Sequence, residues 1–144
     1  METSAPIALF ILLLLSIETA AARSGLYYTR TRGTCTPRYW SNRVEEWPRM
    51  VPQTSTVRKV FGSGVSDRYR LDLTLLESTA RNEEDNAFGR LVKQASAALL
   101  NSYARQGFPY SPWQVKTMVI ESLVSEEAAA NLAQRLFIVN RDCN

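Results

Sequence analysis

Cys35 and Cys143 are the residues best suited to chemistry in this 144-residue sequence, which contains no histidine. An even pair of cysteines in an oxidising compartment most simply forms one intramolecular disulfide. Closing a loop of about 109 residues would stabilise the fold by about 4 to 5 kcal/mol in the chain-entropy model. Two thiolates alone do not complete a tetrahedral metal shell. We therefore expect a structural disulfide between Cys35 and Cys143, no metal and no cofactor.

The remaining polar residues do not form a pattern typical of catalysis. Without histidine, a catalytic nucleophile would need a lysine or a carboxylate as its general base. No motif in the sequence indicates such a residue. Glycoside hydrolysis needs two carboxylates held about 5 to 9 Å apart across a bond. The candidates, Glu45 with Glu46 and the run 83–85, are neighbours in sequence and resemble solvated turns or helix faces. The sequence predicts no catalytic residue and no enzyme.

Rigid and aromatic residues are concentrated beside the first cysteine, in GTCTPRYWSNRVEEW (residues 33–47). One interpretation is a plug that closes the end of the core, because a buried tryptophan removes on the order of 200 Å² of surface from water. The other is a platform on which sugar rings stack while guanidinium groups meet acidic sugars. The plug is the favoured interpretation. The candidate ligand-binding residues of the platform are Arg38, Tyr39, Trp40, Arg43 and Trp47.

Residues 1–22 have the pattern of a cleaved signal peptide. Their apolar run, Ile7–Ile17, is about half as long as a membrane crossing requires. Ala20 and Ala22 fit a cleavage signal of small residues, which places the mature start near Arg23. The segment before the apolar run contains a glutamate and no lysine or arginine, so an uncleaved anchor is the alternative.

The rest of the chain has the length and composition of one domain. Residues 23–32 lack a helical apolar period and are expected to form a flexible lead-in. Residues 33–144 are expected to form a helical module closed by the disulfide. No stable membrane span is expected once the signal peptide is removed.

Positive charge is concentrated in the first half of the mature chain. Residues 23–70 contain ten basic and three acidic side chains, whereas the remainder contains seven and nine. In an extracellular setting such a surface favours acidic polysaccharide or anionic lipid headgroups as partners, and nucleic acid is not expected there. A surface that only aids solubility is the alternative.

The main helices are predicted in three segments, residues 86–107, 111–124 and 125–140, each with apolar residues at helical spacing and a start or stop signal. Gly107 ends the first, Ser111 and Gln114 form a capping box at the start of the second, and Ser125 begins the third. Asn101 lies on a buried face and is expected to bond backbone groups rather than a ligand. The expected buried residues are Phe88, Leu91, Val92, Ala95, Ala98, Leu99 and Tyr103; then Val115, Met118, Val119 and Leu123; then Ala129, Leu132, Leu136 and Asn140.

Two shorter helices are predicted before these. The segment 54–62 has a cap at Ser55 or Thr54 and a stop at Gly62, and the segment 67–82 contains a second apolar cluster. The predicted fold class is therefore all-α, a small disulfide-closed bundle of three main and about two short helices.

Several sequence motifs of this chain occur together in a module that the chain resembles. They are CTPRYW (35–40), a second tryptophan, VFG (60–62), LVKQASAALLNSY (91–103) and VNRDC (139–143). The module occurs in secreted bacterial surface proteins and is similar to the C-terminal domain of plant protodermal-factor-type cell-wall proteins. The resemblance covers about Gly33 to Cys143. Arg38 replaces the usual glycine and Arg43 the frequent histidine, so a role that requires this histidine is not expected.

The residues and the resemblance together favour a secreted, non-enzymatic structural or interaction protein of the cell surface or cell wall. The alternative is a carbohydrate-binding module that recognises acidic polysaccharide through Trp, Tyr and Arg side chains. A secreted signalling or inhibitory protein is a third class. The expected partners are an acidic polysaccharide or a cell-surface protein.

Overall fold

Helices form the regular structure of the chain in the computed structural model, which describes residues 33–70, 72–82 and 85–143. All of these residues belong to one compact unit. The expected signal peptide (1–22) and lead-in (23–32) lie outside the described residues. The helices are α2 (Pro37–Asn42), the 3-10 turn η1 (Val44–Glu46), α3 (Val57–Phe61), α4 (Ser63–Arg68), α5 (Leu75–Ala80), α6 (Ala87–Ala104), α7 (Pro112–Ser122) and α8 (Glu126–Arg141).

The three long helices are those predicted, and local capping explains where they begin. The Asn86 side chain accepts hydrogen bonds from two backbone N–H groups of the first turn of α6. Ser111 and Gln114 form the predicted capping box of α7, and the Ser125 hydroxyl accepts from the Ala128 N–H at the start of α8. Gly107, with φ of +87°, turns the chain after α6. The all-α prediction is confirmed for the described residues.

The two short helices that were predicted form α3 and α5, but the cap of α3 differs from expectation. Thr56, not Ser55 or Thr54, caps α3, and Thr74 forms a capping box with Glu77 at the start of α5. The two caps lie opposite each other in an isolated β-bridge. The N–H of Val57 bonds the carbonyl of Leu73, and the N–H of Leu75 bonds the carbonyl of Ser55. A contact distant in sequence therefore fixes both caps.

Two further short helices, α2 and α4, lie where the sequence did not predict a separate helix. Thr36 caps α2 by accepting from the Tyr39 N–H at 3.1 Å, and Pro37 occupies the first helical position. Gly62, with φ of +94°, ends α3 and directly precedes α4. Both helices have six residues, too few to show a clear helical period.

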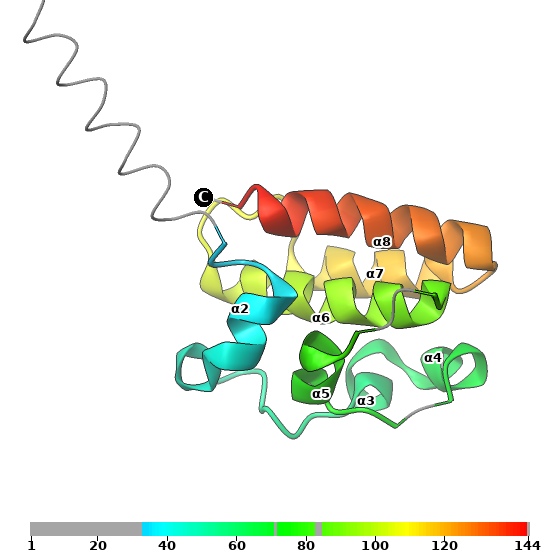
Figure 1. Cartoon of the computed structure of the whole chain (residues 1–144), viewed down its shortest axis with the longest axis horizontal. Coiled ribbons are helices and arrows are strands. Elements are labelled where there is room, and N and C mark those ends of the chain that lie inside the picture. The colour runs from blue at the N-terminus through cyan, green and yellow to red at the C-terminus, as the bar shows by residue number, and fades with distance from the viewer. Residues whose placement is uncertain (1–32, 71, 83–84, 144) are drawn as a thin grey trace, which may run out of the picture. The chain divides into compact units, whose positions relative to one another are not determined.

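The core is built around α6, which lies between α7 and α8 on one side and the short helices on the other (Figure 1). Ala95, Ala97 and Ala98 of α6 are fully buried and allow the neighbouring helices to approach closely. All but two of the residues expected to be buried are buried, and Tyr103 and Met118 are half-buried. Among the described residues, no helix has the length and apolar character needed to cross a membrane.

Candidate functional site

The disulfide joins Cys35, two residues before α2, to Cys143, two residues after α8. Cys35 and Cys143 are bonded, their Cα atoms lie 5.9 Å apart, and both residues are buried. The predicted pairing is confirmed. The disulfide therefore ties the first residues of the described chain to the last.

A buried hydrogen-bond network lies beside the disulfide and is centred on Asn101 of α6. The Trp40 indole Nε1 donates to Asn101 Oδ1 at 2.7 Å. Asn101 Nδ2 donates to the Cys35 carbonyl at 2.8 Å and to Asn140 Oδ1 at 2.9 Å. Trp40 and Asn101 are both 0% exposed, so water cannot reach their polar atoms. These hydrogen bonds satisfy those atoms inside the protein instead.

Asn140 extends this network to the surface of the bundle. Its Nδ2 donates to the backbone carbonyl of Gln94 and to Gln94 Oε1, each at 3.0 Å. We call the chain of residues Trp40, Asn101, Asn140 and Gln94 the asparagine network. It links the disulfide end of the core to the half-buried Gln94 side chain. Asn101 bonds a backbone carbonyl, as expected, and its two other partners are side chains that the sequence did not indicate.

The second tryptophan of the aromatic stretch is also internal. Trp47 is 8% exposed, and its Nε1 donates to the Trp40 carbonyl at 2.9 Å. The guanidinium of Arg105 lies 4.9 Å from the centre of the Trp40 ring, and its Nη2 donates to the Thr34 carbonyl at 2.8 Å. The aromatic stretch therefore packs into the bundle and is held there by hydrogen bonds.

Tyr39 lies at the edge of this packed region. Its ring is half-buried and meets the Trp40 ring edge-on, with ring centres 5.4 Å apart. Its hydroxyl donates to Glu46, and burial together with this hydrogen bond raises the pKa of the phenol. This hydrogen bond links α2 to the last residue of η1.

The structure does not bring the five candidate ligand-binding residues onto one exposed surface. Arg38 and Arg43 face solvent, and Arg43 lies 3.8 Å from the exposed Glu45 carboxylate. Trp40 and Trp47 point into the core, so stacking of sugars on either indole would require the bundle to open. Ligand binding through Arg38 or Arg43 remains a prediction.

Trp113, the third tryptophan, is the exposed one, at 76%. It lies in the first turn of α7, on a face that also carries the exposed Ile120. The sequence analysis did not select it as a candidate. The signal was present, because Trp113 falls outside the predicted buried face of this helix.

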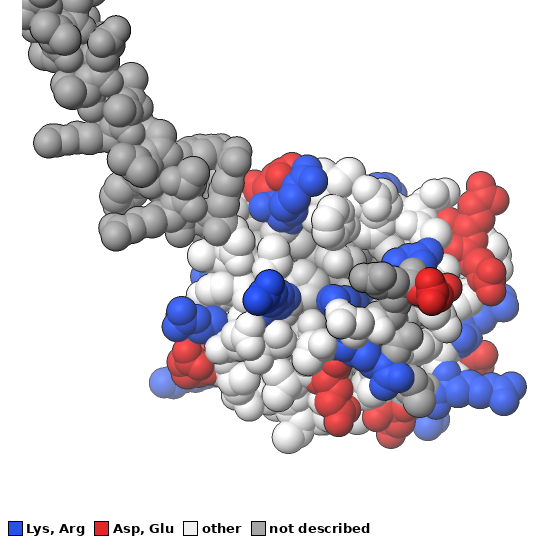
Figure 2. All heavy atoms as spheres, in the orientation of Figure 1, with Lys and Arg blue, Asp and Glu red and all other residues white. Residues whose placement is uncertain are grey.

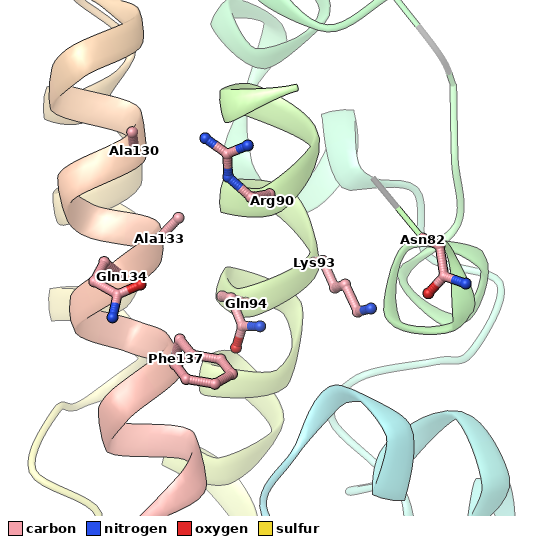
Figure 3. A pocket seen from close by; sticks show the side chains of 8 residues that line it. All are labelled: Asn82, Arg90, Lys93, Gln94, Ala130, Ala133, Gln134 and Phe137. Atoms are coloured by element: carbon pink, nitrogen blue, oxygen red, sulfur yellow. The ribbon is translucent and has the colours of Figure 1, made fainter. Parts of the chain in front are cut away.

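A groove of about 480 Å³ runs between α6 and α8 (Figure 3). The Arg90 side chain points from α6 toward α8, whereas the Lys93 side chain points from α6 toward Asn82. The Phe137 ring points back from α8 toward Gln94. Asn82 lies across from them, in the chain that follows α5. The lining residues are Asn82, Arg90, Lys93, Gln94, Ala130, Ala133, Gln134 and Phe137.

The sequence analysis missed this groove because its walls come from distant parts of the chain. The available signal was the spacing of Arg90, Lys93 and Gln94, which places three polar side chains on one face of α6 away from the apolar stripe. Nothing in the sequence indicated that α8 would lie beside that face. The groove combines two cations, three amide side chains and one aromatic ring, a set that can bind a ligand with acidic and hydroxyl groups.

Charge over the described surface is mixed. Figure 2 shows Lys and Arg on the visible face interspersed with Asp and Glu rather than gathered in one patch. The described residues include no group of three or more potential metal-ligating Cys, Asp or Glu side chains. The visible face, where the structure describes it, therefore carries no continuous basic patch.

Comparison with known proteins identifies one family. Residues 34–142 match the family model described as the Protodermal factor 1 C-terminal domain. No curated protein and no solved structure shows a significant match to the chain. The match covers nearly all of the chain that the structure describes.

Proposed function

We propose that this chain, which belongs to the family of the protodermal factor 1 C-terminal domain, is a secreted, non-enzymatic protein that acts by binding at the plant surface or cell wall. The family is named after a protodermal factor, and the protoderm is the outer cell layer of a young plant. That name supports a role at the surface, in keeping with the signal-peptide pattern of residues 1–22.

The single observation that carries this proposal is the use of the motif residues inside the fold. The disulfide, the two indoles and Asn101 are buried. Hydrogen bonds run from the Trp47 indole to the Trp40 carbonyl, from the Trp40 indole to Asn101, and from Asn101 to the Cys35 carbonyl. A structural disulfide supports folding in an oxidising compartment, which means export from the cytosol. Because the motif residues are buried by packing, a ligand can reach only the outer surface of the module. This supports a role in binding rather than catalysis by the motif residues.

Secretion is tested by following the full chain in plant cells with a tag at its C-terminus. We expect the tagged protein in the extracellular and wall fractions, with a mature N-terminus within one or two residues of Arg23. The reason is the short apolar run and the small residues before Arg23. N-terminal sequencing of the purified protein checks the cleavage.

The matched control lacks residues 2–22 and should remain inside the cell. Recovery of the intact chain from the membrane fraction, with Met1 retained, would contradict the proposal and favour the uncleaved anchor.

A carbohydrate-binding module is the second candidate function, and the groove between α6 and α8 favours it. Among the described residues, the groove is lined by cations and amide groups and by no acidic side chain. This places the candidate binding surface away from the aromatic stretch. The resemblance to bacterial surface-protein domains and the role as a signalling or inhibitory protein remain predictions, with no feature of the groove in their favour.

A further inference from the structure

We propose that the groove between α6 and α8 binds carboxylated sugar residues of an acidic polysaccharide, with Lys93 meeting the sugar carboxylate and the Gln94 amide bonding a sugar hydroxyl. The inference rests on the carbohydrate-binding form of the proposed function, and it names the ligand class and the site. The charge of the groove, the fixed orientation of one amide and the exposed ring opposite it support this assignment.

The charge of the groove selects for an anion. Arg90 and Lys93 line it, and none of the lining residues that the structure describes is acidic. Arg90 also takes part in another interaction within the chain, so we assign the carboxylate to Lys93. A lysine ammonium is a compact charge with three donors on a flexible stem, and it can follow a carboxylate carried on a sugar ring.

The asparagine network orients Gln94. Asn140 Nδ2 occupies Gln94 Oε1, and Asn140 is in turn held by Asn101. This leaves the Gln94 NH₂ group as the donor available to a ligand. Because the Gln94 amide is already fixed, less side-chain entropy is lost when a ligand hydroxyl accepts a hydrogen bond from it.

The opposite wall favours a sugar over a simple anion. Phe137 is 43% exposed and lies across from Gln94, where its ring can pack against the C–H face of a pyranose (Figure 3). The Arg141 guanidinium lies 5.7 Å from the centre of this ring and pairs with Asp142 at 3.1 Å, so we give it no ligand contact. The volume of about 480 Å³ lies within the range of about 300 to 1,000 Å³ typical of small-ligand sites. It is far larger than an inorganic anion needs.

The test is calorimetric titration of the purified, oxidised protein with a trimer of galacturonate. We expect the wild type to bind the trimer and to lose binding when the trimer is methyl-esterified, because the ester removes the charge and keeps the shape. Lys93→Glu should weaken binding by about tenfold or more, since a like charge then faces the carboxylate. Gln94→Ala should weaken it about threefold or more through the lost hydrogen bond. Melting curves verify that each variant is folded.

Two controls separate the site from general charge. Lys116→Glu changes the net charge equally but lies on α7, and we expect less than about a twofold effect. An equal loss in Lys116→Glu and Lys93→Glu would overturn the site. The double variant Arg38→Glu with Arg43→Glu tests the exposed arginines that the sequence nominated. If this variant lost binding of the trimer while Lys93→Glu kept it, the groove would be excluded as the site. Carbohydrate binding by the protein would then be retained, at the surface of Arg38 and Arg43.

The ligand class is tested separately from secretion. Polyaspartate that competed as well as the trimer would overturn the sugar assignment, because charge alone would then suffice. No binding of the trimer by the wild type would overturn the inference as a whole. The proposal of a secreted, non-enzymatic protein would stand or fall on the localisation and N-terminal sequencing instead.

Discussion

Replacing both Cys35 and Cys143 with alanine is expected to lower the free energy of unfolding by about 4 to 5 kcal/mol. The disulfide spans a sequence separation of 108 residues, and its removal restores the conformational freedom of that whole loop to the unfolded chain. Typical domains are stable by about 5 to 15 kcal/mol, so the variant should be marginal at growth temperature. Alanine is chosen because both cysteines are buried and a serine hydroxyl would need a partner there. Urea denaturation of the two proteins gives the difference.

The matched control is the wild type measured with and without reductant. Reduction should lower the midpoint of the wild type toward that of the variant and leave the variant unchanged. A double variant as stable as the oxidised wild type would contradict the assignment of the disulfide as the main constraint on this fold.

Trp40→Ala is expected to destabilise the protein by about 3 to 5 kcal/mol, as truncation of a large core aromatic does. Trp40 is fully buried, and its loss opens a cavity and removes the donor that satisfies Asn101 Oδ1. It also removes the ring beneath the Arg105 guanidinium. Thermal and urea unfolding measure the effect.

Trp113→Ala provides the control, because Trp113 is 76% exposed and should change the free energy of unfolding by less than about 0.5 kcal/mol. The trimer of galacturonate is titrated into the same samples. A Trp40→Ala protein with an unchanged melting curve and lost sugar binding would reject the plug and restore the stacking platform.

The elements that could be predicted from the sequence are those whose signals are local. Ser111 and Gln114 lie three residues apart and each bonds the other's backbone. Because this signal is local, α7 could be predicted together with its cap. The disulfide followed from there being only two cysteines. The plug was favoured over the platform, and the structure places both of its tryptophans inside.

What could not be predicted depends on contacts between distant residues. The cap of α3 lies at Thr56 because the chain there pairs with Thr74. The six-residue helix α2 is too short to be stable alone and depends on packing against α5 and α6. The groove depends on α8 lying beside α6, and on Asn140 reaching Gln94 from 46 residues away. The residues were visible in the sequence, but their neighbours were not.

The central claim is that the aromatic stretch closes the core while ligand binds in the groove between α6 and α8. The most direct measurement is a proton–nitrogen correlation spectrum of the isotopically labelled, oxidised protein during titration with the galacturonate trimer. It observes the indole N–H groups of Trp40 and Trp47 and the side-chain NH₂ of Gln94 at the same time. We predict that the Gln94 signals shift with added trimer while both indole signals stay in place and exchange slowly with solvent. Indole signals that exchange rapidly and shift with the trimer, beside unmoved Gln94 signals, would contradict the claim.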